Sequence, residues 1–293
     1  MDDQPASLGA EKNRINAGLR SADQHRVQGQ YAKAESLYLE LLPLAESIFG
    51  PDHLRVSAVL NNLAILYKYT GKFDEAERLY RRALQILERA LGPDHTEVAT
   101  IYHNLGGLEH ARGRYAAGEG PARLSVEIRE RALGPDHPDV AADAAALAAI
   151  LDGLGRYDES EPLYHRALAI FEREYGPEHY EIAINLNNLG ALKYAQGHLN
   201  EAEQLYRRAL EIKEKLLTPE HPDVAMTLNN LAILCKVRGS YAEAGALYRR
   251  ALAIFEKALQ PTHPKIISCR KNYAILTRKN ERSPTATVIS RPD

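Results

Sequence analysis

The tetrad Gly50-Pro51-Asp52-His53 returns five more times along the chain, each copy starting 42 residues after the one before. The later copies are Gly92-Pro93-Asp94-His95, Gly134-Pro135-Asp136-His137, Gly176-Pro177-Glu178-His179, Thr218-Pro219-Glu220-His221 and Gln260-Pro261-Thr262-His263. A fixed period of this length, without insertions, indicates one supersecondary unit stacked on copies of itself. The sequence therefore predicts an elongated repeat structure rather than a globule.

Between two tetrads the chain carries the pattern of two amphipathic helices. Apolar residues at helical spacing predict a first helix over roughly 54–70 and a second over roughly 73–91. Gly71 provides the turn between them, and the tetrad glycine ends the second helix. Tyr80 is expected to fill the space between neighbouring units, as are its counterparts Tyr38, Tyr164, Tyr206 and Tyr248. The unit is a helical hairpin, and the fold class is all-α.

The six tetrad histidines suggest a metal site, but their spacing argues against one. Each belongs to a different unit, and neighbouring units lie about 10 Å apart, a helix diameter. Metal ligands all need to lie about 2 Å from one ion. We therefore expect no metal, and we expect Asp94 or His95, and their counterparts, to cap the following helix. The chain also lacks a glycine-rich phosphate loop, an HExxH pair and a Gly-x-Ser-x-Gly elbow, so neither cofactor, catalytic residue nor enzymatic activity is expected.

Composition and charge exclude several classes of partner. The net charge of −2 gives no reason to expect nucleic acid, and no apolar run reaches the length of about 20 residues that a membrane helix needs. The polar start Met1-Asp2-Asp3 does not resemble a secretory signal. Cys235 and Cys269 fall at core-facing helical positions, which is typical of reduced thiols in a cytoplasmic protein. Arginine pairs such as Arg81-Arg82 are balanced by glutamate four residues earlier.

The predicted organisation has three parts. Residues 1–10 and 282–293 are polar and rich in Pro, Ser, Thr and Asp, and they are expected to be disordered. Residues 11–281 form the repeat array, with about six helix pairs and a last helix that covers the final core.

The repeated residues resemble a known family. Leu63-Ala64, Tyr67, Gly71, Ala76, Tyr80 and Ala83 resemble the tetratricopeptide repeat signature. The period of 42 residues, with Leu-Asn-Asn-Leu-Ala, Leu-Tyr-Arg-Arg-Ala-Leu and Leu-Gly-Pro-Asp-His, resembles the kinesin light chain type over about residues 13–280. The resemblance implies a right-handed superhelical solenoid whose first helices line the concave side. Only about a dozen residues precede the first helix, where kinesin light chains carry a coiled coil, so an adaptor made of repeats alone fits better.

A row of amides on the first helices is the main candidate binding site. An amide is a poor helix former, so packing alone does not ask for it, and its donor and acceptor suit the backbone of an extended peptide. The resemblance implies that this row contacts the main chain of a bound peptide. The alternative is that each amide bonds the neighbouring unit and only holds the stacking. The candidates are Asn61, Asn62, Asn104, Asn187, Asn188, Asn229, Asn230 and Asn272.

One turn further along the same face, the chain carries mostly basic or aromatic residues. A groove with positive groups and amides favours an acidic segment with one or two apolar anchors. Asp152 alone has the opposite charge in this row. The candidates are Lys68, His110, Tyr194, Lys236 and Arg278, with Tyr69 beside them.

The third full unit departs from the pattern. Ala145 and Ala146 replace both asparagines, which leaves either a depression that accepts a large apolar side chain or simple drift in a good helix former. Gly118, Gly120 and Pro121 interrupt the second helix of the preceding unit, so we expect a shortened or bent helix near 115–122.

These observations favour a cytoplasmic adaptor or scaffold that binds an extended, acidic segment of a partner protein along its concave groove. The partner is a protein or peptide, and neither nucleic acid nor membrane is expected. Two alternatives stay open. One is a regulatory module that controls a separate effector, and the other is a structural protein that self-associates through its convex face or its ends.

Overall fold

The structure is a computed structural model that describes residues 4–281, without the side chains of 4–10, 12 and 278–281. In that range the chain forms thirteen α-helices and no strand. The helices are α1 (Gln4–Val27), α2 (Tyr31–Phe49), α3 (Leu54–Thr70), α4 (Phe73–Leu91), α5 (Thr96–Ala111), α6 (Tyr115–Leu133), α7 (Pro138–Gly153), α8 (Tyr157–Tyr175), α9 (Tyr180–Ala195), α10 (Leu199–Leu216), α11 (Pro222–Val237), α12 (Tyr241–Ala258) and α13 (Pro264–Glu281).

The predicted unit agrees with the structure, since α3 and α4 occupy the ranges expected for its two helices. At the start of the chain α1 includes residues 4–10, for which the sequence predicts disorder. The predicted C-terminal tail, 282–293, lies outside the described residues.

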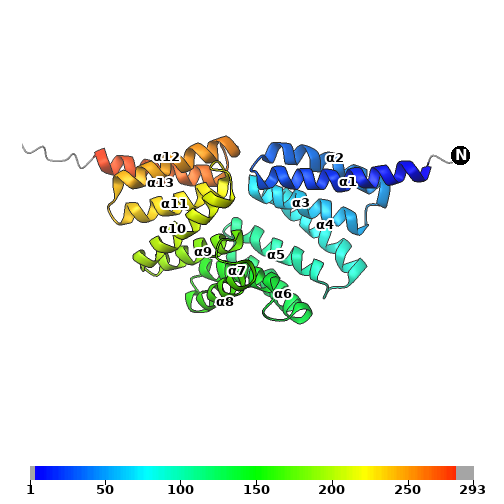
Figure 1. Ribbon diagram of the computed structural model, residues 1–293, viewed down its shortest axis with the longest axis horizontal. Helices are drawn as coiled ribbons and strands as arrows, with labels where there is room; N and C mark the ends of the chain where they lie inside the picture. Colours follow the sequence, from blue (N-terminus) through cyan, green and yellow to red (C-terminus); the bar gives the residue numbers. More distant parts are fainter. Residues whose placement is uncertain (1–3, 282–293) are drawn as a thin grey trace, which may run out of the picture.

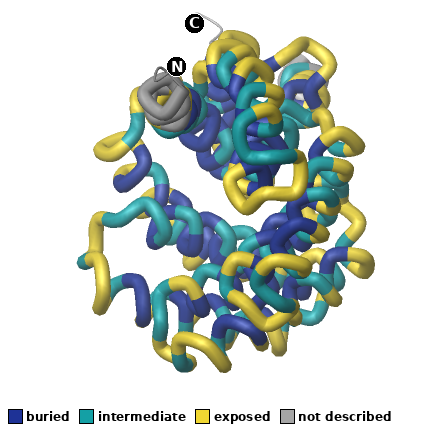
Figure 2. The backbone as a smooth tube through the Cα atoms, turned by 90° about the vertical axis from the view of Figure 1, so that its right-hand side faces the viewer, coloured by how far each residue is buried: buried dark blue, intermediate teal, exposed yellow. Residues whose placement is uncertain are grey.

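The helices form an all-α repeat solenoid, as the sequence predicts. Each odd-numbered helix packs against the even-numbered helix that follows it, and successive odd-numbered helices also contact one another. No comparable contact joins successive even-numbered helices in the described part of the chain. The odd-numbered helices therefore form the inner wall of an arc and the even-numbered helices its outer wall (Figure 1). Exposed segments lie mainly on the outer rim of this arc, and buried ones mainly inside it (Figure 2).

The tetrad histidines are helix caps. In each tetrad the histidine Nδ1 accepts the backbone N–H two residues later, as between His95 and Glu97 at 3.1 Å. The other five caps are His53 to Arg55, His137 to Asp139, His179 to Glu181, His221 to Asp223 and His263 to Lys265. This confirms histidine as the capping residue, and it satisfies one backbone donor at the start of each inner helix.

The core between units is built as the sequence predicts. The five repeated tyrosines, Tyr38, Tyr80, Tyr164, Tyr206 and Tyr248, are all buried. Cys235 and Cys269 are buried free thiols, so both lie at the core-facing positions expected for them.

The predicted shortening near 115–122 is wrong. Helix α6 is continuous from Tyr115 to Leu133 with Pro121 inside it, and it is as long as α4 and α8, at 19 residues. Gly118 has a packing role instead, because a Cβ atom there would lie 3.1 Å from the carbonyl oxygen of Gly106 on α5. These two glycines let α5 and α6 approach closely, and that contact supports α6 across the proline.

Ion pairs tie neighbouring outer helices together. Arg208 bonds Glu172 of the preceding unit at 2.8 Å, and the same register joins three further pairs. These are Arg82 with Glu46, Arg166 with Glu130, and Arg250 with Glu214. The second arginine of each Arg-Arg pair is therefore engaged within the array.

The two ends of the arc lie side by side (Figure 1), and side chains of the last units contact the first units. His263, before α13, donates a hydrogen bond from Nε2 to the backbone oxygen of Tyr69 on α3 at 3.0 Å. Pro222 packs against Gly29, where a Cβ atom would lie 3.0 Å from the proline Cδ. One hydrophobic cluster joins residues such as Leu66 of α3 with residues such as Ile266 of α13. We call this contact the closure seam, formed by Val27, Gly29, Tyr69 and Gly71 with His221, Pro222, His263 and Pro264.

Candidate functional site

Much of the amide row is used to join neighbouring units. Asn104 donates from Nδ2 to the Oδ1 of Asn61 at 2.8 Å, and Asn230 donates to Asn187 at 3.3 Å. Asn62 has no asparagine before it and donates instead to Asp23 of α1 at 3.2 Å. The rule is that the second asparagine of one unit bonds the first asparagine of the unit before it. For these residues the structure has the geometry of the stacking alternative.

The alanine in the third full unit breaks this rule and frees one amide. The bonded pairs are separated by 43 residues, and the residue 43 positions before Asn188 is Ala145. Alanine has no acceptor, and Asn188 has no hydrogen-bond partner within the described part of the chain. The corresponding hydrogen bond is also missing between Asn272 and Asn229 of the unit before it. Asn229 has a buried Oδ1 without a partner, and Asn272 makes no side-chain hydrogen bond to a described residue.

A buried ion pair replaces the amide bond beside the alanines. The carboxylate of Asp143, on α7, accepts from Arg129 of α6 at 2.8 Å and pairs with Nδ1 of His103 on α5 at 2.7 Å. Asp143 is fully buried, and Ala145 is buried beside it on the same helix. Sequence reasoning missed this contact. The signal was the charged Asp143 inside an otherwise apolar helix.

The second row carries polar side chains that are free of ion pairs. Lys68, Asp152 and Lys236 form no ion pair or hydrogen bond through their side chains to the described residues, and neither does Tyr194. The ring of His110 packs edge-on against the ring of Tyr115, with the ring centres 5.4 Å apart. The remaining member of the row, Arg278, has a side chain outside the described residues.

Burial shifts the pKa values of several groups in this row. It lowers the pKa of Lys68 to about 8, with help from the charges of Lys265 and Arg26. It also lowers the pKa of His110, with a contribution from Lys68. Burial raises the pKa of Asp152 to about 6. By accessible surface Lys68, Asp152 and Lys236 are half-buried, whereas His110 is exposed.

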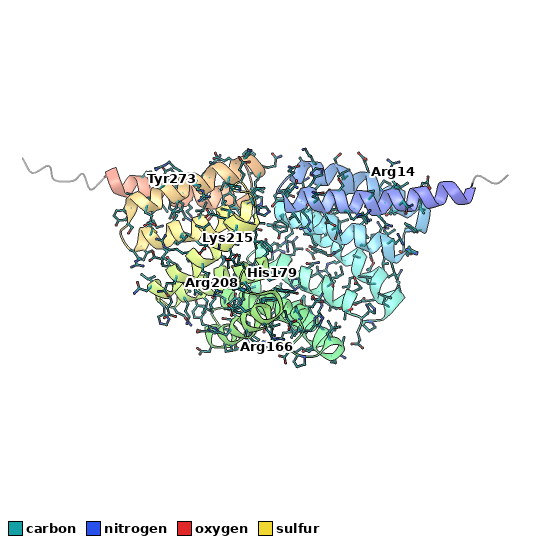
Figure 3. The ribbon with its side chains drawn as sticks, viewed as in Figure 1. Arg14, Arg166, His179, Arg208, Lys215 and Tyr273 are labelled. Carbon is teal, nitrogen blue, oxygen red and sulfur yellow. The ribbon has the colours of Figure 1, made fainter. Side chains whose placement is uncertain are left out.

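The closure seam borders a cavity of about 380 Å³. Its walls come from three distant parts of the chain, Tyr31 and Tyr69 from the first units, His179 and Tyr180 from the middle, and Leu216 and Asp223 towards the end. His179 lies near the centre of the arc, whereas Arg166 lies on its outer margin (Figure 3). The sequence shows each of these residues but not their meeting, because the solenoid has to close before they come together.

Charge in the seam is unevenly balanced. The Tyr180 hydroxyl donates to Asp223, whose Oδ2 also lies 3.7 Å from the Nδ1 of His221. Burial alone would raise the pKa of Asp223, but Lys213, Lys265 and His221 outweigh it and hold that pKa below its usual value. Lys213 is buried, and burial lowers its pKa to about 8. Asp223 therefore has several cations near it, and Glu181 is a second carboxylate close to Tyr69 and Tyr180.

The described residues contain no group of three or more His, Cys, Asp or Glu side chains arranged to hold a metal ion. None of the helices within those residues has the length and apolar character needed to cross a membrane.

The sequence profile of the tetratricopeptide repeat matches residues 14–89, 69–117, 141–215 and 216–287, and a second profile of the same repeat matches residues 98–139. None of the curated proteins matches the sequence. Among solved structures, BtubC (BKLC) from P. vanneervenii is 28% identical with a TM-score of 0.53, over 85% of this chain and 92% of that one.

The repeats of a putative kinesin light chain from Podospora anserina are 26% identical with a TM-score of 0.51, over 71% of this chain and 96% of that one. The similarity to kinesin light chain-like repeat proteins is therefore confirmed. A Rap protein in complex with competence and sporulation factor has a TM-score of 0.61 at 14% identity, over 92% of this chain and 87% of that one, and shares the fold alone.

Proposed function

The chain belongs to the tetratricopeptide repeat family, and on that premise we propose that it is an adaptor that holds an extended segment of a partner protein along its inner wall. Tetratricopeptide repeats generally mediate binding between proteins. The proposal concerns where this chain binds and what it selects. Its buried free thiols, Cys235 and Cys269, support a reducing, cytoplasmic setting.

The observation that carries the proposal is the free amide of Asn188. Asn61, Asn104, Asn187 and Asn230 bond one another between units, but Ala145 leaves the side chain of Asn188 with an unused donor and acceptor on α9. A side-chain amide suits a peptide group, which also has one donor and one acceptor. We therefore assign the main-chain contact to Asn188, with Asn229 and Asn272 as further contacts at the last units.

The preferred ligand is an acidic segment with an apolar anchor. Lys68 and Lys236 lie in the inner row without a carboxylate partner among the described residues. The cavity of about 380 Å³ beside Tyr31, Tyr69 and Tyr180 has room for a large apolar side chain. His110 and Tyr194 extend the same row as polar and aromatic contacts. Unpaired cations beside an aromatic-lined cavity favour that combination of acid and apolar anchor.

Affinity capture with inner-wall variants tests the proposal. Asn188→Ala and Lys236→Gln should both reduce recovery of the partner, whereas the outer-wall control Arg81→Gln should not. Arg81 lies on α4, where its ion-pair partner among the described residues is Glu77 of its own helix. Titration with peptides derived from the captured protein then measures the binding affinity of the wild-type chain and of each variant. If Arg81→Gln abolishes capture and both inner variants retain it, the docking surface is the convex face.

Light scattering coupled to size exclusion distinguishes the self-assembling alternative. An adaptor should keep the mass of one chain across concentration, at 32.6 kDa. A mass that rises with concentration, together with capture of only the same chain, would contradict the adaptor.

A further inference from the structure

Two lysines from opposite ends of the array each lie within 6 Å of the centre of one tyrosine ring. The ammonium nitrogen of Lys68, on α3, lies 5.6 Å from the centre of the Tyr69 ring, and that of Lys265, on α13, lies 5.9 Å from it. Neither lysine forms an ion pair with a described residue, and the polar contact of the Lys265 Nζ is the weak acceptor Met226 Sδ, at 2.9 Å. Neither ammonium group is therefore in direct contact with a carboxylate among the described residues.

Lys265 also departs from the charge pattern of its own repeat. It lies two residues after a tetrad histidine, in the first turn of an inner helix, where the helix dipole favours a negative charge. Arg55 is the other basic residue at this position, but it bonds Asn16 at 3.1 Å and lies over the ring of Phe49. Lys265 lies over the ring of Tyr69 instead, and its hydrogen-bond acceptor is the sulfur of Met226. The remaining four units follow the dipole, with Glu97, Asp139, Glu181 and Asp223.

The surroundings of these lysines are rich in positive charge. Arg26 is matched by Asp23 of its own helix, at 3.4 Å. Asp223 is the carboxylate whose charge acts on Lys68, on Lys265 and on the buried Lys213. Burial lowers the pKa of both Lys68 and Lys265, and the charge of Lys265 lowers that of Lys68 further. An anion close to both lysines would favour their charged forms, which burial and mutual repulsion disfavour.

We propose that Lys68 and Lys265 are the two halves of an oxyanion site, for a carboxylate or phosphate group, that is complete only when the solenoid is closed. One half lies on α3 and the other on α13, and the closure seam brings them together. An anion between them offsets the repulsion of the two ammonium groups. Anion binding and closure therefore favour each other by the same factor, as linked equilibria require.

This site goes beyond the proposed function, because it needs no partner protein to be tested. The anion has two sources, a free phosphate or the acidic side chain of a docked segment. Either one would act as a clasp that holds the first units against the last, and its loss would let the solenoid open.

Thermal unfolding with inorganic phosphate is the first test, against chloride at matched ionic strength. Phosphate should raise the melting temperature of the wild-type chain by roughly 4 °C near saturation. Lys68→Gln and Lys265→Gln should each abolish that rise. The control Lys33→Gln, which removes an exposed charge on α2, should keep it.

The melting temperatures of the same variants in chloride distinguish a binding site from a structural contact. In chloride, Lys68→Gln should melt at the same temperature as wild type or higher, because it removes an unpaired repelling charge. A lower melting temperature in chloride would overturn the proposal, as would an equal phosphate response in wild type and both seam variants.

Spin labels across the seam test closure itself. Labels at Gln28→Cys and Glu220→Cys lie on exposed residues beside the seam, and the native cysteines are buried. Phosphate should narrow the measured distance distribution towards its short component in wild type but not in Lys265→Gln. An unchanged distribution in wild type at a saturating phosphate concentration would contradict the coupling.

The same measurements with added peptides distinguish the two sources of the anion. If hexaglutamate reproduces the phosphate effect and hexaglutamine does not, an acidic side chain can serve as the clasp. If phosphate alone acts, the ligand is a free anion. The proposal is overturned if neither phosphate nor hexaglutamate acts.

Discussion

The Nε2 of His263 lies 3.0 Å from the backbone oxygen of Tyr69, although 194 residues separate the two in sequence. The same imidazole accepts the Lys265 N–H at its Nδ1, at 3.0 Å, and so caps α13. Only the neutral ring with its proton on Nε2 can make both bonds. One side chain thus starts the last helix and closes the solenoid.

Replacing His263 should weaken the seam while leaving the cap in place. Asparagine is a good capping residue but is too short to reach Tyr69. We expect His263→Asn to cost about 1 kcal/mol in the free energy of unfolding, the value of one hydrogen bond. His95→Asn is the matched control, because His95 is exposed and only caps α5. Urea unfolding measures both, and equal losses in the two variants would show that the seam bond contributes nothing.

Acid should open the seam. Burial lowers the pKa of both His221 and His263 below the ordinary value of 6.5. The charge of Lys265 lowers both pKa values further, and Lys213 also lowers that of His221. Asp223 beside His221 acts in the opposite direction and raises the pKa of that histidine. A histidine with a lowered folded-state pKa stabilises the fold above its unfolded pKa and loses that contribution as the pH falls through the folded value.

The radius of gyration from X-ray scattering should therefore rise between about pH 6.5 and pH 5. The double variant with Asn at 221 and 263 should show a smaller change over the same range. A wild-type radius that stays constant down to pH 5 would contradict a seam held by neutral histidines.

Asp152 should destabilise the chain at neutral pH. Burial raises its pKa to about 6, and its carboxylate lies near the C-terminal end of α7, where the helix dipole disfavours a negative charge. A raised folded-state pKa means that the penalty is present above about pH 6 and disappears as the pH falls below the unfolded value, near 4.

Asp152→Asn should therefore raise the free energy of unfolding on the order of 1 kcal/mol at pH 7.5 and leave it unchanged at pH 4. Thermal unfolding at the two pH values checks this. A loss of stability at pH 7.5 would mean that the carboxylate has a favourable partner.

The two kinds of inner asparagine should respond differently to removal. Asn104→Ala breaks a buried bond to Asn61 and should cost about 1 kcal/mol. Asn188→Ala should leave stability unchanged or slightly higher, since alanine is the better helix former. It should instead weaken the affinity for a bound peptide roughly 3- to 10-fold, as loss of one hydrogen bond does. Denaturation and peptide titration of both variants separate the roles, and a stability loss at Asn188 would show that its amide is engaged.

Alanine substitutions at two glycines inside helices should change the stability of the chain in opposite directions. A Cβ atom at Gly190 would lie 2.9 Å from the Tyr206 ring, so Gly190→Ala should destabilise the chain by roughly 1–3 kcal/mol. A Cβ atom at Gly120 would meet open space, so Gly120→Ala should stabilise α6 by about 0.5–1 kcal/mol. Thermal unfolding of the two variants provides the comparison, and a stabilising Gly190→Ala would show that Tyr206 has room to move.

Part of the candidate site was predictable from spacing. The bond from Asn104 to Asn61 and the missing partner of Asn188 follow from one separation of 43 residues and from Ala145. The histidine caps also follow, because each joins residues two apart. The predicted shortening of α6 was wrong, because the prediction considered Pro121 alone. It did not include the close contact between Gly106 and Gly118, which supports the helix.

The tetrads themselves hint at the seam. Thr218 and Gln260 replace the usual glycine. The helices before them end one residue earlier, at Leu216 and Ala258, and are followed by the extended Leu217 and Leu259. The histidines of these two tetrads, His221 and His263, are buried, whereas His53 and His95 are exposed. The replacement is visible in the sequence, but its partners across the seam are not.

The sequence alone determined the period, the helices, their caps and the slots for tyrosine and small residues, because each depends on neighbours within one or two units. Whether the arc stays open or closes depends on a small rotation between units, added over the whole array. No single unit encodes that sum. Only the tertiary structure could therefore bring Lys68 to Lys265 and His263 to Tyr69.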